Sequence, residues 1–338
     1  MTQPLLRMAG MSVELKAGDR TVDIIADTTL ELNRGERLGV VGESGSGKSV
    51  TALAVMGLLP QSMRVRGQLT FDGRDLATMP EDEYCKFRGR RMAMIFQEPM
   101  TALNPVKTIG AQIAEGRILH LGETRAEAEK RARLLLDKVG LPAPRFNLGL
   151  YPHQLSGGQR QRVMIAAAIA CEPDLLIADE PTTALDVTVQ AQILDLLNEL
   201  IDDAGMTLML ITHDLGVVFE MTNRIAVMYA GRVVETGRTD DVFSRMAHPY
   251  SRGLFAASPH GAGLMPRPQG MGRARLTAIP GVVPDPFARP PHCTFADRCA
   301  FVEPDCRESM PKLRVLEARD GVEHRAACLH PRTDLVRP

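Results

Sequence analysis

The first residues that could do chemistry form a glycine-rich run that ends in lysine and serine. Residues Gly42 to Ser49 read GESGSGKS and match the phosphate-binding pattern G-x-x-x-x-G-K-S/T at every position. Glycines let the backbone N–H groups curl around a phosphate, while the lysine charge and the serine hydroxyl suit the terminal phosphates and Mg²⁺. The residues predicted to bind nucleotide here are Gly42, Ser44, Gly45, Gly47, Lys48 and Ser49. An ordinary glycine-rich turn is the alternative, and the complete match argues against it.

Two carboxylates follow a second apolar run, Leu175 to Ala178. Such a run predicts a buried parallel strand, and open α/β sheets place their chemistry at the carboxyl ends of parallel strands. We therefore expect Asp179 to hold Mg²⁺ through water and Glu180 to act as the general base for the attacking water. A solvated turn would explain an Asp-Glu pair on its own. Its place after the phosphate-binding loop favours the catalytic interpretation.

Two further polar side chains follow short apolar runs. Gln97 comes after Met94 to Phe96 and could reach both a metal ion and a water molecule with its amide. His213 comes after Leu210 to Thr212 and could hydrogen-bond a γ-phosphate or the attacking water. Polar surface or a turn explains either residue taken alone. Their order along the chain makes them the predicted catalytic partners of Glu180.

The segment Leu155 to Gln159, LSGGQ, lies between the loop and the acidic pair, and with it the chain resembles the ATPase subunits of ABC transporters. The resemblance implies an α/β fold, a P-loop NTPase cassette with a RecA-like core and a helical subdomain. It also implies that ATP is bound between two cassettes, and that a helix beginning near Gln159 points at the γ-phosphate held by the opposite subunit. The residues assigned to this contact are Ser156, Gly157, Gly158 and Gln159. Ala184 to Asp186 would cross the dimer interface, with Asp186 at the nucleotide.

One segment departs from the family pattern. Family members stack an aromatic side chain on the adenine from a segment upstream of the loop lysine, yet Gly18 to Ile25 contains no aromatic residue. Val22 or Ile24 would give a weaker apolar contact.

Composition limits the class of protein. A length of 338 residues with 44% hydrophobic content permits a full core and suggests about two domains. A net charge of -1 gives no general attraction to nucleic acid or lipid, so no nucleic-acid partner is expected. No apolar run is long enough to span a membrane, and Met1 to Pro4 lacks the features of a signal peptide. We expect a soluble intracellular protein that serves a membrane only through partners.

Strand-like runs alternate with helical patterns, as a layered α/β domain requires. The predicted strands are Leu38 to Val41, Gln68 to Phe71, Met92 to Phe96, Leu175 to Ala178, Thr207 to Ile211, Ile225 to Met228 and Val233 to Thr236. The last two flank Ala230-Gly231 and predict a hairpin.

The domain boundaries rest partly on the resemblance. We place a nucleotide-binding domain at 1–245, with a helical subdomain at 98–170, and a C-terminal extension at 246–338. By the resemblance, a groove of the helical subdomain receives a short cytoplasmic helix of a transmembrane subunit. Thr124 to Val139 predicts one helix of it, and a plain surface helix with Leu134, Leu135 and Val139 facing the core is equally consistent. Ser258 to Gly272 is rich in Gly and Pro and predicts a linker.

Four of the six cysteines cluster in the extension. Their pattern is C-x5-C-x6-C-x21-C, formed by Cys293, Cys299, Cys306 and Cys328. A reducing compartment disfavours disulfides, and zinc sites have closer ligand pairs, although three histidines (His292, His324 and His330) could contribute. An iron-sulfur cluster tolerates the spacing, which does not distinguish the metals. We expect Cys85 and Cys171 to be inert thiols, the latter on an apolar helix face.

Three segments of the extension sharpen the resemblance to the ATPases of dipeptide and oligopeptide importers, some of which carry a 4Fe-4S cluster on four such cysteines. They are His248 to Leu254, Ile279 to Pro284 and Cys293 to Cys299. The resemblance implies a peripheral subunit on the cytoplasmic face of the bacterial inner membrane, with ATP, Mg²⁺ and a 4Fe-4S cluster, or alternatively Zn²⁺. Its partners would be two transmembrane permeases, a second homologous ATPase and, through the complex, an extracytoplasmic peptide-binding protein. The alternatives are an importer ATPase for nickel or another solute, a soluble ABC ATPase that remodels ribosomes or DNA, and a nucleotide-binding regulator without turnover.

Overall fold

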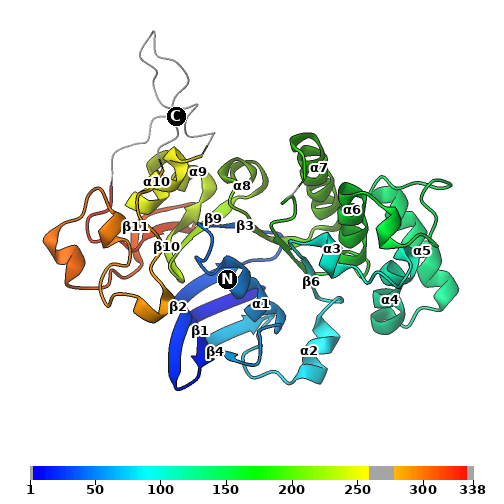
Figure 1. The fold of residues 1–338 in the computed structure, drawn as a ribbon, viewed down its shortest axis with the longest axis horizontal. Coiled ribbons are helices and arrows are strands. Elements are labelled where there is room, and N and C mark those ends of the chain that lie inside the picture. The colour runs from blue at the N-terminus through cyan, green and yellow to red at the C-terminus, as the bar shows by residue number, and fades with distance from the viewer. Residues whose placement is uncertain (1–2, 184, 259–277, 333–338) are drawn as a thin grey trace, which may run out of the picture. The chain divides into compact units, whose positions relative to one another are not determined.

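The chain divides into two compact units in the computed structural model (Figure 1). Residues 1–32, 36–77 and 211–338 make the first unit, and residues 33–35 and 78–210 make the second. The structure describes residues 3–183, 185–258 and 278–332. The predicted linker, Ser258 to Gly272, therefore lies outside the described residues apart from Ser258.

The first unit contains two groups of strands. The strands are β1 (Leu6–Ala17), β2 (Arg20–Leu32), β3 (Arg37–Val41), β4 (Met63–Phe71), β5 (Arg74–Asp75), β9 (Arg224–Tyr229), β10 (Arg232–Arg238), β11 (Arg314–Arg319) and β12 (Val322–Ala326). One group is an antiparallel sheet in the order β2-β1-β4-β5, and the other runs in the order β11-β12-β10-β9-β3. In the second group only β3 and β9 are parallel, while β9 and β10 form the predicted hairpin around Ala230 and Gly231.

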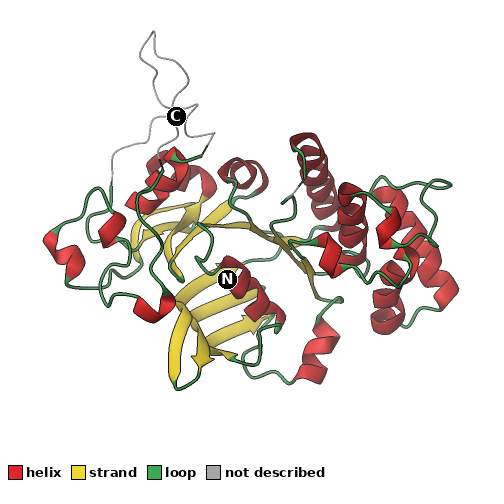
Figure 2. Ribbon diagram, in the orientation of Figure 1, coloured by secondary structure: helices red, strands yellow, loops and turns green. Residues whose placement is uncertain are grey.

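The helices of the first unit are α1 (Lys48–Met56), α8 (Leu215–Met221), α9 (Thr239–Arg245) and α10 (Pro249–Ala256). The extension beyond α10 is mostly loop in the described residues, with the short 3-10 turns η2 (Pro286–Ala288), η3 (Ala296–Arg298) and η4 (Pro304–Arg307) (Figure 2). It nevertheless shares the core of the unit, because the ring of Phe295 packs 5.2 Å from that of Tyr229 and 5.4 Å from that of Tyr250. Two of its strands, β11 and β12, extend the sheet beyond β10.

The second unit combines short parallel strands with helices. Its elements are α2 (Glu81–Phe87), β6 (Met92–Ile95), α3 (Pro99–Ala102), α4 (Ile109–Leu121), α5 (Arg125–Lys138), η1 (Pro152–Gln154), α6 (Gly157–Ala168), β7 (Leu175–Asp179), α7 (Val187–Ala204) and β8 (Thr207–Ile211). The strands β6 and β7 pair in parallel, and each is buried along its whole length. Helices α4, α5 and α6 lie side by side (Figure 1).

The predicted helix at Thr124 to Val139 is confirmed, and its residues explain where it starts. A capping box joins Thr124 and Glu127 at its start. The expected core stripe was partly wrong, since Leu134 is 52% exposed whereas Leu136 and Val139 are fully buried. A helix turns by 100° per residue, so Leu136 continues the face of Ala128 and Ala132 and Leu134 points to the other side. Cys171 is buried as expected, but it follows the end of α6 and does not lie on the helix.

Candidate functional site

The phosphate-binding loop connects β3 to α1 in the first unit. Lys48 is the first residue of α1, and its Nζ donates hydrogen bonds to the carbonyl oxygens of Gly42 at 2.8 Å and Glu43 at 3.1 Å. Gly42 has φ 153°, and a Cβ there would lie 2.2 Å from the carbonyl oxygen of Met228. Gly45 has φ 78° and opens onto free space. The loop is therefore wound tightly on its inner side and open on the side where a phosphate would bind.

The strand β2 and the turn between β9 and β10 contact this loop. The N–H of Gly231, in the β9–β10 turn, donates to the carbonyl oxygen of Ser46 at 3.0 Å. The carbonyl oxygen of Gly231 in turn accepts from the N–H of Ala26 on β2 at 2.8 Å. A Cβ at Gly47 would lie 2.2 Å from Cδ1 of Ile25, so β2 packs directly on the loop. Contacts with the β9–β10 turn and with β2 thus fix the curvature of the loop.

Two residues that sequence reasoning missed, Arg298 and Tyr250, contact the loop at Glu43, and all three residues lie within the first unit. The carboxylate of Glu43 pairs with the guanidinium of Arg298 from η3, and the N–H of Glu43 donates to the hydroxyl of Tyr250 on α10 at 2.8 Å. Burial raises the pKa of the Tyr250 hydroxyl, which stays protonated. No sequence motif reveals these contacts, because the partners lie more than two hundred positions apart along the chain.

The predicted catalytic residues of the second unit converge. Gln97 follows β6, and its Nε2 donates to Oε2 of Glu180 at 3.1 Å. The same oxygen accepts from the hydroxyl of Thr183 at 2.8 Å, and Asp179 is buried at the end of β7. Glu180 has φ 47°, a conformation unusual for a residue with a side chain and typical of residues that a site holds in place.

The signature segment caps a helix. Helix α6 begins at Gly157, two residues earlier than the expected start near Gln159, because the Ser156 side chain accepts from the Gln159 N–H and the Gln159 side chain accepts from the Ser156 N–H. Ser156 and Gly157 are exposed, so the N-terminus of the helix faces solvent. The Gln161 amide donates to the carbonyl oxygen of Pro181 at 2.6 Å and ties α6 to the segment after Glu180.

Two further predicted residues lie in segments that lead into helices. Asp186 caps α7 by accepting from the N–H of Val189 at 2.9 Å, whereas Ala184 lies outside the described residues. His213 is exposed between β8 and α8. The residue before it, Thr212, donates its N–H to the carbonyl oxygen of Val40 at 3.3 Å, which places His213 near the strand that leads into the phosphate-binding loop.

The segment with the missing aromatic residue forms the start of β2. Val22 and Ile24 are half-buried there. An aromatic side chain reaches this region from the extension, since the Arg20 guanidinium lies 4.9 Å from the centre of the Phe287 ring and donates to the Phe287 carbonyl oxygen at 3.0 Å. The sequence pattern gave no sign of this contact.

The four clustered cysteines meet in space. Cys293, Cys299, Cys306 and Cys328 line one pocket of the extension, together with His248, Phe295 and His330. Burial raises the pKa of the Cys328 thiol to about 11 and also raises those of Cys293 and Cys299. The four side chains thus share one pocket, while within the described part of the chain the ligand atoms that lie within 4.8 Å of one another are those of Asp305, Cys306 and His330.

Of the three histidines considered as additional ligands, His330 lies nearest to this pocket. It lines the pocket, and its Nε2 lies 2.8 Å from Oδ1 of Asp305, next to the thiol of Cys306. His324 is instead paired with the buried Glu235 at 2.7 Å.

Comparisons with known proteins match both parts of the chain. The ABC transporter family matches residues 25–183, and the oligopeptide/dipeptide transporter C-terminal region matches residues 234–306. The dipeptide transport ATP-binding protein DppD of Escherichia coli (strain K12) is 48% identical over 320 residues, which cover 94% of this chain and 93% of that protein. This chain belongs to the ABC transporter ATPases. A putative peptide import ATP-binding protein of Brucella abortus (strain 2308) is 47% identical over 319 residues, covering 94% of each chain.

Solved structures confirm the predicted cassette fold of this ABC ATPase. The ATP-binding cassette MJ0796, in a dimeric post-hydrolysis state with ADP and phosphate, aligns with a TM-score of 0.63 and 29% identity over 69% of this chain and 98% of that one. The cbiO1 protein of Clostridium perfringens, part of the ABC transporter complex cbiONQ, aligns with a TM-score of 0.60 and 26% identity over 72% of this chain and 91% of that one. ATP is therefore the nucleotide of this family, with Mg²⁺, and the chain is an ATPase.

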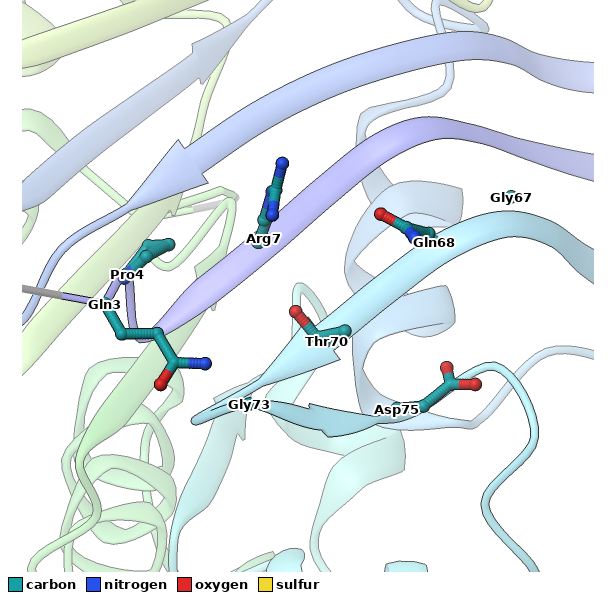
Figure 3. Close-up of a pocket in the computed structure, with 8 residues that line it drawn as sticks. All are labelled: Gln3, Pro4, Arg7, Gly67, Gln68, Thr70, Gly73 and Asp75. Atoms are coloured by element: carbon teal, nitrogen blue, oxygen red, sulfur yellow. The ribbon is translucent and has the colours of Figure 1, made fainter.

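Another hollow of this ABC ATPase lies on its antiparallel sheet. Figure 3 shows the hollow, which is lined by Gln3, Pro4, Arg7, Gly67, Gln68, Thr70, Gly73 and Asp75. None of the residues predicted from motifs lines it. Within the described ranges, no helix has both the length and the apolar character required to cross a bilayer.

Proposed function

We propose that this chain is the ATP-hydrolysing subunit of an importer of dipeptides and oligopeptides across the bacterial cytoplasmic membrane. The observation that carries the proposal is the match of residues 234–306 to the C-terminal region of oligopeptide/dipeptide transporters, joined to a cassette in one chain. Relatives named for peptide import extend over nearly the whole length of the chain. The division into a nucleotide-binding domain at 1–245, with a helical subdomain at 98–170, and an extension at 246–338 is part of this proposal.

The assigned roles follow the geometry of each motif. Lys48 and the open side of the loop bind the phosphates of ATP, as the hydrogen bonds of Lys48 to the loop carbonyls and the free space at Gly45 support. Ser49, Gln97 and Asp179 are the Mg²⁺ ligands, and the ion supplies positive charge against the charge that develops in phosphoryl transfer.

Glu180 orients and deprotonates the attacking water. The hydrogen bonds from Gln97 and Thr183 hold its carboxylate in one position, which suits a general base. His213 contacts the γ-phosphate or the water from the segment after β8.

A second ATPase completes the site. The exposed start of α6 presents N–H groups and the positive end of the helix dipole to solvent, which suits a γ-phosphate held by a homologous partner subunit. Val187, just after Asp186, is 84% exposed and is consistent with an interface at the start of α7. ATP would close the two cassettes on each other, and hydrolysis would let them separate.

Two permease subunits are the proposed membrane partners. A groove in the second unit is lined by apolar and polar side chains, among them Phe96, Leu103, Lys107, Gln112 and Met164. Near it Met100 and Val106 are 60% and 79% exposed, so the region offers apolar surface to a docking helix. The chain would then lie on the cytoplasmic face of the membrane, with a peptide-binding protein reaching the complex from the other side.

The cysteine pocket is proposed to hold a 4Fe-4S cluster, with Zn²⁺ as the alternative. The four cysteines that line one pocket support a thiolate-bound group in an extension that is mostly loop. Protein purified without oxygen should be brown and contain iron and sulfide in stoichiometric amounts. Colourless protein with one zinc per chain would favour zinc, and metal-free protein would exclude both.

Reconstitution tests the transport function. The chain, its two permeases and its partner ATPase should take up a labelled dipeptide or tripeptide into liposomes, with ATP hydrolysis stimulated by the peptide-loaded binding protein. Uptake of Ni²⁺ without peptide, or hydrolysis that no peptide stimulates, would contradict the proposal.

A further inference from the structure

The C-terminal extension contacts the phosphate-binding loop through the side chain of Arg298. The Arg298 guanidinium donates from Nη1 to Oε2 of Glu43 at 2.7 Å and from Nη2 to Oε1 at 2.9 Å, a bidentate pair. The Arg298 side chain is only 5% exposed. Glu43 is the second residue of the loop, so the pair lies at the phosphate-binding backbone itself.

The extension fixes this arginine on its other side. Its Nε donates to the carbonyl oxygen of Pro280 at 2.8 Å, and its Nη2 also reaches the carbonyl oxygen of Ile279 at 3.4 Å. Nη1 also lies 3.5 Å from the hydroxyl of Tyr229. Every N–H of the guanidinium thus has a partner, and a planar fork held at all its donors has a single orientation.

A second group holds the same loop residue by its backbone. The Tyr250 hydroxyl accepts from the Glu43 N–H, and the Tyr250 ring packs 4.6 Å from that of Tyr229. Phe295, three residues before Arg298, packs on both tyrosines. The positions of the Glu43 side chain and backbone therefore both depend on one aromatic cluster, Tyr229, Tyr250 and Phe295, to which the extension contributes.

We propose that Arg298 is a positioning residue for nucleotide binding, which neutralises Glu43 beside the phosphates and makes the affinity for nucleotide depend on the state of the extension. A carboxylate left without its guanidinium would repel the phosphate anions at short range and in a partly buried setting. The pair with Arg298 removes that repulsion.

The position of Arg298 links the loop to the cysteines, and this step rests on the proposed metal group. Arg298 directly precedes Cys299, and its turn is closed by hydrogen bonds from the Arg298 N–H to Phe295 at 3.0 Å and from the Cys299 N–H to Ala296 at 3.3 Å. A group bound by Cys293 and Cys299 would hold both ends of this turn. Loss of the group would loosen Arg298 and so weaken nucleotide binding.

A double-mutant comparison tests the role of Arg298. Arg298→Gln, Glu43→Gln and the double variant are prepared as full-length chains, and their Kd values for MgADP are measured by calorimetry. We expect binding about tenfold weaker for Arg298→Gln, which lies within the usual range of coupling between sites. Glu43→Gln should bind at least as tightly as wild type, and the double variant should recover because the repelling charge is gone. Arg307→Gln is the matched control, since Arg307 directly follows Cys306 but pairs with the exposed Asp297.

The pattern of rescue separates positioning from folding. If Arg298→Gln and the double variant bind equally weakly, the arginine merely supports the fold of the extension and the inference is overturned. Wild-type affinity in Arg298→Gln would also overturn it. Arg298→Lys, which restores the charge without the fork, should recover part of the affinity. In the assembled complex Arg298→Gln should raise KM for ATP with little change in kcat.

Metal removal tests the link to the cysteines. Stripping the group from the wild-type chain should weaken MgADP binding, whereas the double variant should bind equally well with and without it. Iron, sulfide and zinc are assayed in the same samples. Loss of metal with unchanged wild-type affinity would overturn the link. Protein that never contained metal would refute the proposed cluster, while the Gln variants would still decide the role of Arg298.

Discussion

Replacing Glu180 by Gln isolates the charge of the proposed general base from its packing. Gln97 and Thr183 each donate a hydrogen bond to Oε2 of the Glu180 carboxylate. A glutamine that places its carbonyl oxygen there keeps both bonds and the same shape. With respect to Gln97 and Thr183, the change removes only the negative charge and the basicity, and the fold should be preserved.

The expected loss follows from the chemistry of a positioned base. General base catalysis contributes about 10²- to 10⁴-fold, which corresponds to about 3–5 kcal/mol of activation free energy. We expect kcat of the assembled transporter complex to fall by that factor while the Kd for ATP stays within a few-fold of wild type. Phosphate release in the steady state gives kcat, and equilibrium binding of ATP gives the Kd.

A matched control is available in the same unit. Glu172 also has a left-handed backbone, with φ 53°, but it is exposed in the turn after α6. Glu172→Gln should therefore leave kcat unchanged. Turnover of the Glu180→Gln complex close to that of wild type would refute the assignment of Glu180 as the base.

Three further changes have defined outcomes. Gly157→Asp should weaken ATP-driven dimerisation with the partner ATPase by at least about tenfold, whereas Gly157→Ala should not, because the nearest atom to a Cβ there is in Leu185 at 4.0 Å and the carboxylate repels the partner's phosphate. Analytical sedimentation in ATP measures the dimer, and equal dimerisation of both variants would contradict the prediction. Burial lowers the pKa of His248 from 6.5 to about 4, so the unfolded chain binds the proton first as the pH falls and the free energy of unfolding should decrease from pH 7 to 4.5. His248→Asn keeps an acceptor for the cap of α10 and should make this pH-dependent decrease in the free energy of unfolding smaller by about 2–3 kcal/mol. Urea unfolding at each pH measures it, and the same dependence on pH in the variant and wild type would contradict the prediction. Cys328→Ser should abolish metal binding measured by elemental analysis, whereas Cys85→Ser, at an exposed position on α2, should retain it; retention by both would exclude Cys328 as a ligand.

The local elements of this chain could be predicted because their signals are local. Buried parallel strands read as continuous apolar runs, which placed β3, β7 and β8 within one residue of their ends. The capping box predicts where a helix starts, and the box of Ser156 and Gln159 could have corrected the expected start of α6. The stripe of α5 was wrong at Leu134, since three consecutive leucines do not reveal which of them faces the core.

The candidate site also combines features that have a local signal in the sequence with features that have none. Lys48, Glu180 and the signature residues could be proposed from the sequence because phosphate chemistry requires given residue types at given spacings. The conformation of Glu180 at φ 47° and its hydrogen bonds from Gln97 and Thr183 could not be predicted in this way, because they depend on how the chain turns after β7.

The sequence by itself determined the cassette, the order of its motifs and the presence of four clustered cysteines, because each is written in short segments of fixed spacing. Only the tertiary structure decided that the cysteines line one pocket and that Arg298 and Tyr250 meet at Glu43. Contacts between residues this far apart depend on the packing of the intervening strands and helices, and one sequence contains no local pattern that records such packing.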